Sequence, residues 1–131
     1  MVEKEIRLHE GRVEVFVKRI RKLFYEKEIP INAEYCKFKP IVPFEERKDG
    51  KYKPINKGDS WGKNWDMAWF YLTGEIPKEW KGNSVTARIN LGGEALSFSK
   101  NGTPETALSC HTIWPDPDFG RDRITITDKA K

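Results

Sequence analysis

The spacing of the apolar residues changes near Trp61, and this change constrains the fold more than any other feature of the sequence. Between residues 11 and 28, apolar residues recur every three or four positions with lysine and arginine between them, which predicts one amphipathic helix ending before Pro30. After Trp61 they form short, often alternating segments separated by turn signals such as Asn101-Gly102, which predicts antiparallel strands with a hairpin at that dipeptide. The predicted strands span residues 67–74, 84–91, 95–99, 106–113 and 124–127.

The segment between the helix and Trp61 is rich in proline. Its prolines, together with the pairs Asp49-Gly50 and Gly58-Asp59, predict mostly extended chain and loops, with a short strand near residues 34–38. We therefore divide the chain into residues 1–60, a helix and extended lead-in packed on the domain, and residues 61–131, the β portion of a single domain or of a larger enzyme. The predicted fold is mainly β: a β-sandwich of the jelly-roll type, whole or lacking strands, preceded by the helix and the lead-in.

The charge distribution argues against two classes of partner. Residues 1–60 hold 15 Lys/Arg against 11 Asp/Glu, and residues 61–131 hold 9 against 9, so basic residues do not form the concentrated patch of a nucleic-acid binder. The chain also contains no apolar run of the length that a signal peptide or a membrane span needs. These features predict a soluble, cytoplasmic protein without nucleic-acid or membrane partners.

Residues for catalysis are scarce. The two histidines, His9 and His111, lie in neither a His-x-Asp nor a His-Glu-x-x-His pattern. Cys110-His111 supplies two zinc ligands, but no further ligands follow at a suitable spacing. The two carboxylates of a glycosidase can be found by chance among 20 Asp and Glu residues. We therefore predict no catalytic residue, no metal ligand and no cofactor within this chain.

Tryptophans are the most informative candidates for binding. Trp61, Trp65 and Trp69 are spaced by four residues in a segment that we interpret as a loop followed by a strand. Most of these rings are expected in the core, because tryptophan is highly buried on average. The alternative is that one or two remain exposed and stack on the apolar face of a sugar. The candidate carbohydrate contacts are Trp61, Trp65, Asp66 and Trp114.

An ordered set of short motifs adds a resemblance. The motifs are Trp61-Gly62, Trp65, Trp69-Phe70, Ile76-Pro77, Trp80-x-Gly82, Gly92-Gly93-Glu94-Ala95-Leu96 and Asn101-Gly102-x-Pro104. Their order resembles the N-terminal region of the α-mannosidases of glycoside hydrolase family 38. The resemblance extends from about residue 11 to residue 128 and is carried by the whole set rather than by any single motif.

The resemblance implies a non-catalytic role for this region. In that family a β-rich domain precedes an α/β barrel, which hydrolyses terminal α-linked mannose with retention, using an Asp nucleophile and a zinc ion held by His and Asp. No residue here matches the His-x-Asp of the zinc site, so zinc is expected in the barrel. The expected partners are the catalytic barrel, mannose-containing sugars and a second copy of the chain. The alternatives are a stand-alone carbohydrate-binding module and a β-sandwich assembly domain.

Overall fold

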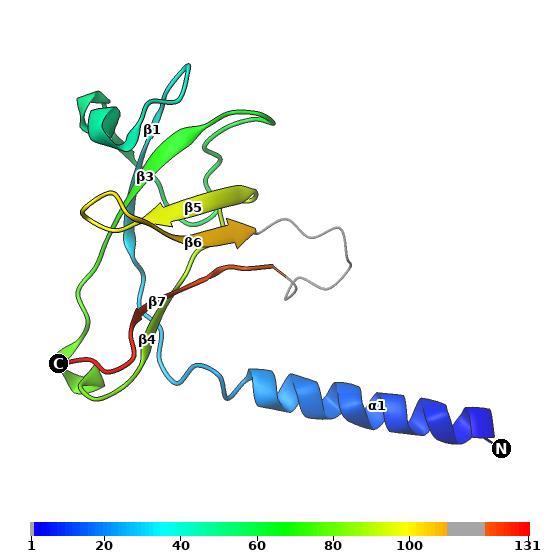
Figure 1. Ribbon diagram of the computed structural model, residues 1–131. Helices are drawn as coiled ribbons and strands as arrows, with labels where there is room; N and C mark the ends of the chain where they lie inside the picture. Colours follow the sequence, from blue (N-terminus) through cyan, green and yellow to red (C-terminus); the bar gives the residue numbers. More distant parts are fainter. Residues whose placement is uncertain (1, 110–119) are drawn as a thin grey trace. The chain divides into compact units, whose positions relative to one another are not determined.

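The computed structural model describes residues 2–109 and 120–131, and it contains two compact units, Met1–Ile31 and Asn32–Lys131 (Figure 1). The first unit contains α1, Val2–Arg21. The second unit contains the strands. In the described part of the chain, no helix combines the length and the apolar character that a membrane span requires.

The helix differs from the prediction at both ends. It begins at Val2 rather than at residue 11, because a glycine in a helix interior costs only about 1 kcal/mol relative to alanine and Gly11 does not stop the helix. It ends at Arg21, and the prediction of an end near residue 28 was wrong. There the Leu23 N–H donates to the Ile20 carbonyl at 2.8 Å, a tighter i to i−3 bond that replaces the α-helical pattern.

In the second unit, the described residues form three small antiparallel sheets, with strand orders β2-β1-β3, β4-β7 and β5-β6 (Figure 1). The strands are β1 (Asn32–Lys37), β2 (Lys53–Pro54), β3 (Ala68–Thr73), β4 (Val85–Arg88), β5 (Glu94–Phe98), β6 (Pro104–Ser109) and β7 (Arg123–Thr127). Two short 3-10 helices, η1 (Phe44–Asp49) and η2 (Lys78–Trp80), lie between them. The mainly β fold with one N-terminal helix is confirmed.

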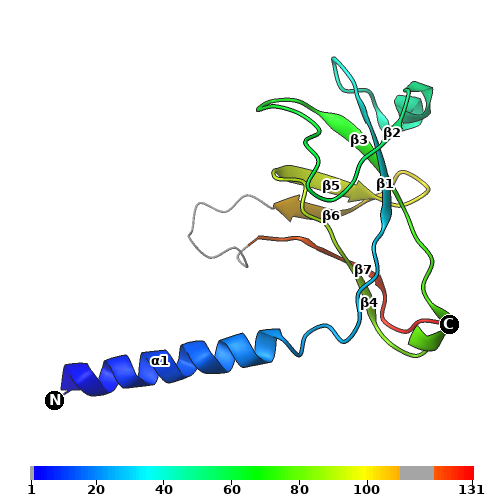
Figure 2. The same ribbon diagram turned by 180° about the vertical axis from the view of Figure 1, so that it is seen from behind.

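Most strands lie where the sequence predicts them. All five predicted segments contain a strand, and β1 occupies the place of the short strand expected in the lead-in. The hairpin at Asn101-Gly102 is also present: β5 and β6 run antiparallel, as Figure 2 shows, and Gly102 has the positive φ of +84° that such a turn requires. Residues 110–113, the end of one predicted strand, lie outside the described residues.

The core is built on β3 and on the strands that follow it. Phe70 stacks on Tyr35 across the β1–β3 pair, with ring centroids 5.8 Å apart. Its neighbour Trp69, which a strand directs to the opposite face, packs against Phe44 and Phe98. An aliphatic cluster completes the core, with Ala87, Ile89 and Leu108 buried and Leu72, Leu91, Ala95 and Ile124 packed against them. Packed aromatic rings therefore lie on both faces of β3, and the loop that leads into β3 is tied to this core through the contact of Trp61 with Phe70.

Candidate functional site

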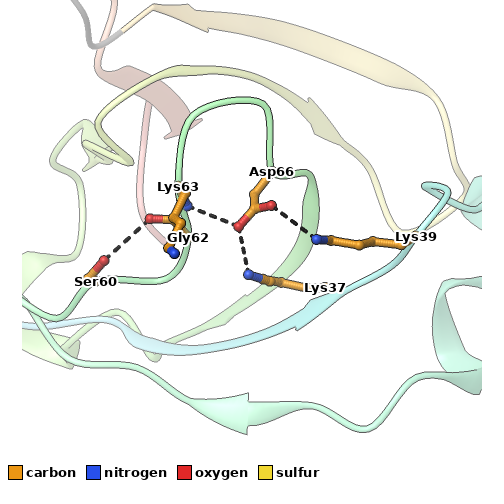
Figure 3. A network of polar contacts seen from close by, with 6 residues as sticks. All are labelled: Lys37, Lys39, Ser60, Gly62, Lys63 and Asp66. Atoms are coloured by element: carbon orange, nitrogen blue, oxygen red, sulfur yellow. Dashed lines mark hydrogen bonds and ion pairs between the residues drawn. The ribbon is translucent and has the colours of Figure 1, made fainter.

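A tight turn precedes β3 and carries two of the predicted site residues. The Asp66 N–H donates to the Lys63 carbonyl at 3.0 Å, and the Lys63 N–H donates to the Asp66 carboxylate oxygen Oδ2 at 2.9 Å. The same two residues are thus joined by a main-chain and a side-chain hydrogen bond. We call residues 63–66 the Trp65 turn (Figure 3).

The Asp66 carboxylate connects this turn to the end of β1. The Lys37 ammonium donates to Oδ2 at 2.7 Å, and the Lys39 ammonium lies 3.6 Å from Oδ1 (Figure 3). The hydrogen bond from Lys37 and the one from the Lys63 backbone, strengthened by the lysine charges, lower the pKa of Asp66 from 3.8 to about 2. Asp66 is therefore a structural anion at neutral pH. We call this arrangement the Asp66 clamp.

Gly62 gives the clamp its space. A Cβ atom at this position would lie 3.0 Å from the Cβ and 3.1 Å from the Oδ2 of Asp66, closer than ordinary van der Waals contact. The Ser60 hydroxyl donates to the Gly62 carbonyl at 3.4 Å, as Figure 3 shows. A side chain at position 62 would therefore press on the carboxylate that closes the turn.

Trp65 has the backbone conformation that tryptophan rarely adopts. Its φ is +68°, and it is the only non-glycine residue with a positive φ in the described part of the chain. Such a conformation costs an L-residue roughly 1–2 kcal/mol. The side chain is 98% exposed, so its own burial does not compensate for this cost. The turn thus holds a large aromatic ring in solvent.

Trp61 belongs to the core instead. Its indole N–H donates to the Leu91 carbonyl at 2.9 Å, and its ring packs edge-on against Phe70 at 5.4 Å between centroids. Trp69 is fixed in the same manner, since its indole N–H donates to the Val42 carbonyl at 2.9 Å. Trp114 lies outside the described residues. The structure thus brings Trp65 and Asp66 together in one exposed turn and assigns Trp61 a packing role.

The sequence contains little that predicts the Asp66 clamp. Lys37 lies 29 residues before Asp66, and nothing in its local sequence distinguishes it from the other lysines. The sequence does not predict the positive φ of Trp65 either. A turn with a positive φ at its third position usually has glycine there, and Lys63-Asn64-Trp65-Asp66 has tryptophan instead. The local sequence indicates only that a turn occurs here, through Asn64, a common turn residue, and Gly62, two residues before it.

The pH dependence of stability is expected to reveal the clamp. Because the pKa of Asp66 is lowered on folding, its carboxylate stabilises the fold above the ordinary value of 3.8, and this contribution is lost as the pH falls toward about 2. Asp66→Asn removes the titrating group. Urea unfolding at a series of pH values between neutral and about 2 should therefore show a smaller loss of stability on acidification in D66N than in the wild type.

The lysine partner supplies the control. Lys37→Met removes the largest cause of the shift while retaining the apolar stem, so the pKa of Asp66 should rise toward 3.8. A titration of the Asp66 carboxyl carbon by NMR measures this value directly. A pKa of 3.8 or higher in the wild-type protein would show that the clamp does not form.

The described side chains contain no cluster of metal ligands. Among the side chains that the structure describes, those of residues 10–109 and 120–131, no three His, Cys, Asp or Glu side chains gather in a group that could hold a metal ion. Asp66 is hydrogen-bonded and ionised, so it has no proton to donate as a general acid near neutral pH. Cys110 and His111 lie outside the described residues. The arrangement is suited to presenting a surface rather than to transferring protons.

Comparisons with known proteins identify the fold. A family model described as "Alpha-mannosidase, jelly roll domain" matches residues 27–131. Alpha-mannosidase 2C1 from Homo sapiens is 31% identical over 68 residues, covering 52% of this chain and 6% of that protein, and the Mus musculus protein of the same name matches to the same extent. No solved structure gives a significant match. Because the family model covers most of the chain, the chain belongs to the α-mannosidase family and contains its jelly roll domain.

Proposed function

We propose that this chain acts as the non-catalytic N-terminal domain of an enzyme that hydrolyses terminal α-linked mannose. The match of residues 27–131 to the α-mannosidase jelly roll is the observation that carries the proposal. The curated relatives are themselves named α-mannosidases, and the matched segment is a small part of their length. The bulk of those relatives lies outside the matched segment, and the proposal places hydrolysis there.

The zinc ion of the family belongs, in this proposal, to the catalytic barrel. The described residues do not fit it, because they contain no group of three ligating side chains. We therefore assign no step of hydrolysis to this chain. That the enzyme as a whole acts in the cytoplasm stays a prediction.

The jelly roll would serve as a scaffold against the barrel. Several apolar side chains on or beside its strands are about half exposed, and a neighbouring domain of the same polypeptide would cover them. They are Met67, Tyr71, Leu96 and Ile126. Association with a second copy of the chain and an assembly role both stay predictions, as does the absence of nucleic-acid and membrane partners.

Hydrolysis assays test the proposal. The purified 131-residue chain is expected to release no nitrophenol from a nitrophenyl α-mannoside above the buffer blank, with or without added zinc, because the proposal places the zinc site and the nucleophile in the catalytic barrel. The protein encoded by the full reading frame is expected to hydrolyse the same substrate in a zinc-dependent manner.

Two outcomes would overturn the proposal. Zinc-dependent hydrolysis by the 131-residue chain alone would place the catalytic centre in this domain. A reading frame that stops at Lys131, with no His-x-Asp segment following, would remove the barrel on which the scaffold role depends. The coding DNA and the assay test these two points independently.

A further inference from the structure

Trp65 differs from the other tryptophans of the segment in every respect that matters for binding. The indole N–H groups of Trp61 and Trp69 donate to backbone carbonyls, and both rings pack against aromatic neighbours. Trp65 is 98% exposed, and its indole N–H has no hydrogen-bond partner among the described residues. Both the face of the ring and its polar edge are therefore accessible to a ligand.

The backbone that carries the ring is fixed before any ligand arrives. The turn that carries it is closed twice between Lys63 and Asp66, and the Lys37 ammonium, from the end of β1, fixes the same carboxylate at 2.7 Å. A turn with a fixed backbone loses little backbone conformational entropy when its exposed ring binds a ligand.

The surroundings of the ring supply hydrogen-bond donors for a hydroxylated ligand. Lys63 and Asn64, both exposed, belong to the same turn and can donate hydrogen bonds. An apolar stacking face combined with nearby polar donors matches a pyranose ring, which has an apolar face and peripheral hydroxyl groups.

We propose that Trp65, presented by the clamped turn, is a stacking platform for a pyranose ring and binds mannosyl units outside the catalytic centre. The choice of mannose among pyranoses rests on the proposed function, whereas the stacking site rests on the turn alone. Because one ring makes most of the contact, binding is weak, with a dissociation constant in the millimolar range.

Indole N–H resonances in the NMR spectrum of the full 131-residue chain provide the test. Methyl α-D-mannopyranoside is expected to shift the Trp65 indole signal in a saturable manner while the signals of Trp61 and Trp69 stay in place. Sorbitol, which carries hydroxyl groups but no ring, is the matched ligand control and is expected to cause no saturable shift. The Trp65 signal is assigned by its absence from the spectrum of the Trp65→Gly variant.

Three variants separate the contribution of the Trp65 ring from that of the rest of the protein. Trp65→Gly removes the ring and suits the positive φ, so the variant is expected to fold and to lose affinity by about tenfold or more. Trp80→Phe removes a half-buried tryptophan from η2 and should leave mannoside binding unchanged. Asp66→Asn keeps the ring but weakens the clamp, and it should lower the affinity less than W65G does.

Three results would overturn the inference. They are the absence of a saturable Trp65 shift at tens of millimolar mannoside, an equal response to sorbitol, and binding that persists in W65G. Shifts of Trp65 that depend on protein concentration without sugar would assign the ring to a protein interface instead. None of these results affects the scaffold proposal, which the hydrolysis assay and the coding DNA test separately.

Discussion

Replacing Trp69 by alanine is expected to lower the free energy of unfolding of the Asn32–Lys131 unit by about 3–5 kcal/mol. Trp69 lies on β3, where its ring packs against Phe98 at 5.1 Å and Phe44 at 6.1 Å between centroids. Its indole N–H also donates a hydrogen bond to the Val42 carbonyl, and the substitution would leave that carbonyl without this donor. The variant therefore loses apolar contact, an aromatic cluster and a hydrogen bond together.

Trp65→Ala is the matched control for this substitution. It deletes the same side chain from the same segment, but the ring is 98% exposed and makes no core contact, so the free energy of unfolding should change by less than about 0.5 kcal/mol. Urea unfolding followed by circular dichroism measures both variants without relying on tryptophan fluorescence. Equal effects of the two substitutions would contradict the assignment of Trp69 to the core.

These two residues also show where prediction from sequence ends. Trp61, Trp65 and Trp69 have equal spacing, and their residue types are the same, so a pattern alone cannot separate a core ring from an exposed one. The three residues differ in the backbone: Trp65 has a positive φ, whereas Trp61 and Trp69 do not. That conformation depends on Asp66 and on lysines near the end of β1, which local sequence does not place.

The strands were predicted more reliably than the site because their signals are local. Alternation and turn residues marked β3 to β7, and Asn101-Gly102 marked the β5–β6 hairpin. β2 was not predicted, since it is only Lys53–Pro54 and exists through its pairing with β1. The predicted ends of the helix were wrong for a related reason. Gly11 and Pro30 are residues that often mark helix ends, but the helix continues through Gly11 and ends well before Pro30.

The resemblance to α-mannosidases was predictable because it depends on order rather than on three-dimensional contacts. The motif series from Trp61 to Pro104 lies within the family match at residues 27–131, and the jelly roll expectation is confirmed. The structure shows what several residues of these motifs do. Trp61 and Trp69 of the series are core rings, Gly62 makes room for Asp66, and Gly102 occupies the hairpin turn.

Gly102→Ala is the second substitution with a large expected effect, a loss of about 2–4 kcal/mol in the free energy of unfolding. The φ of Gly102 is +84°, so any L-residue is strained there. A Cβ atom would also lie 2.7 Å from Cδ1 and 2.8 Å from Cε1 of Phe44. Phe44 cannot retreat freely, because it stacks on Phe98 at 5.6 Å and lies edge-on to Trp69.

Gly82→Ala separates the two contributions to that loss. Gly82 has a nearly equal φ of +86°, but nothing lies within 4 Å of the position that a Cβ atom would occupy. It should therefore show the backbone strain alone, roughly 1–2 kcal/mol. The excess loss in Gly102→Ala then measures the contact with Phe44, and Phe44→Leu in the same chain should reduce that excess because a smaller side chain can yield. Equal losses at the two glycines would mean that the β5–β6 turn does not press on the aromatic core, and that the hairpin is positioned by its own hydrogen bonds.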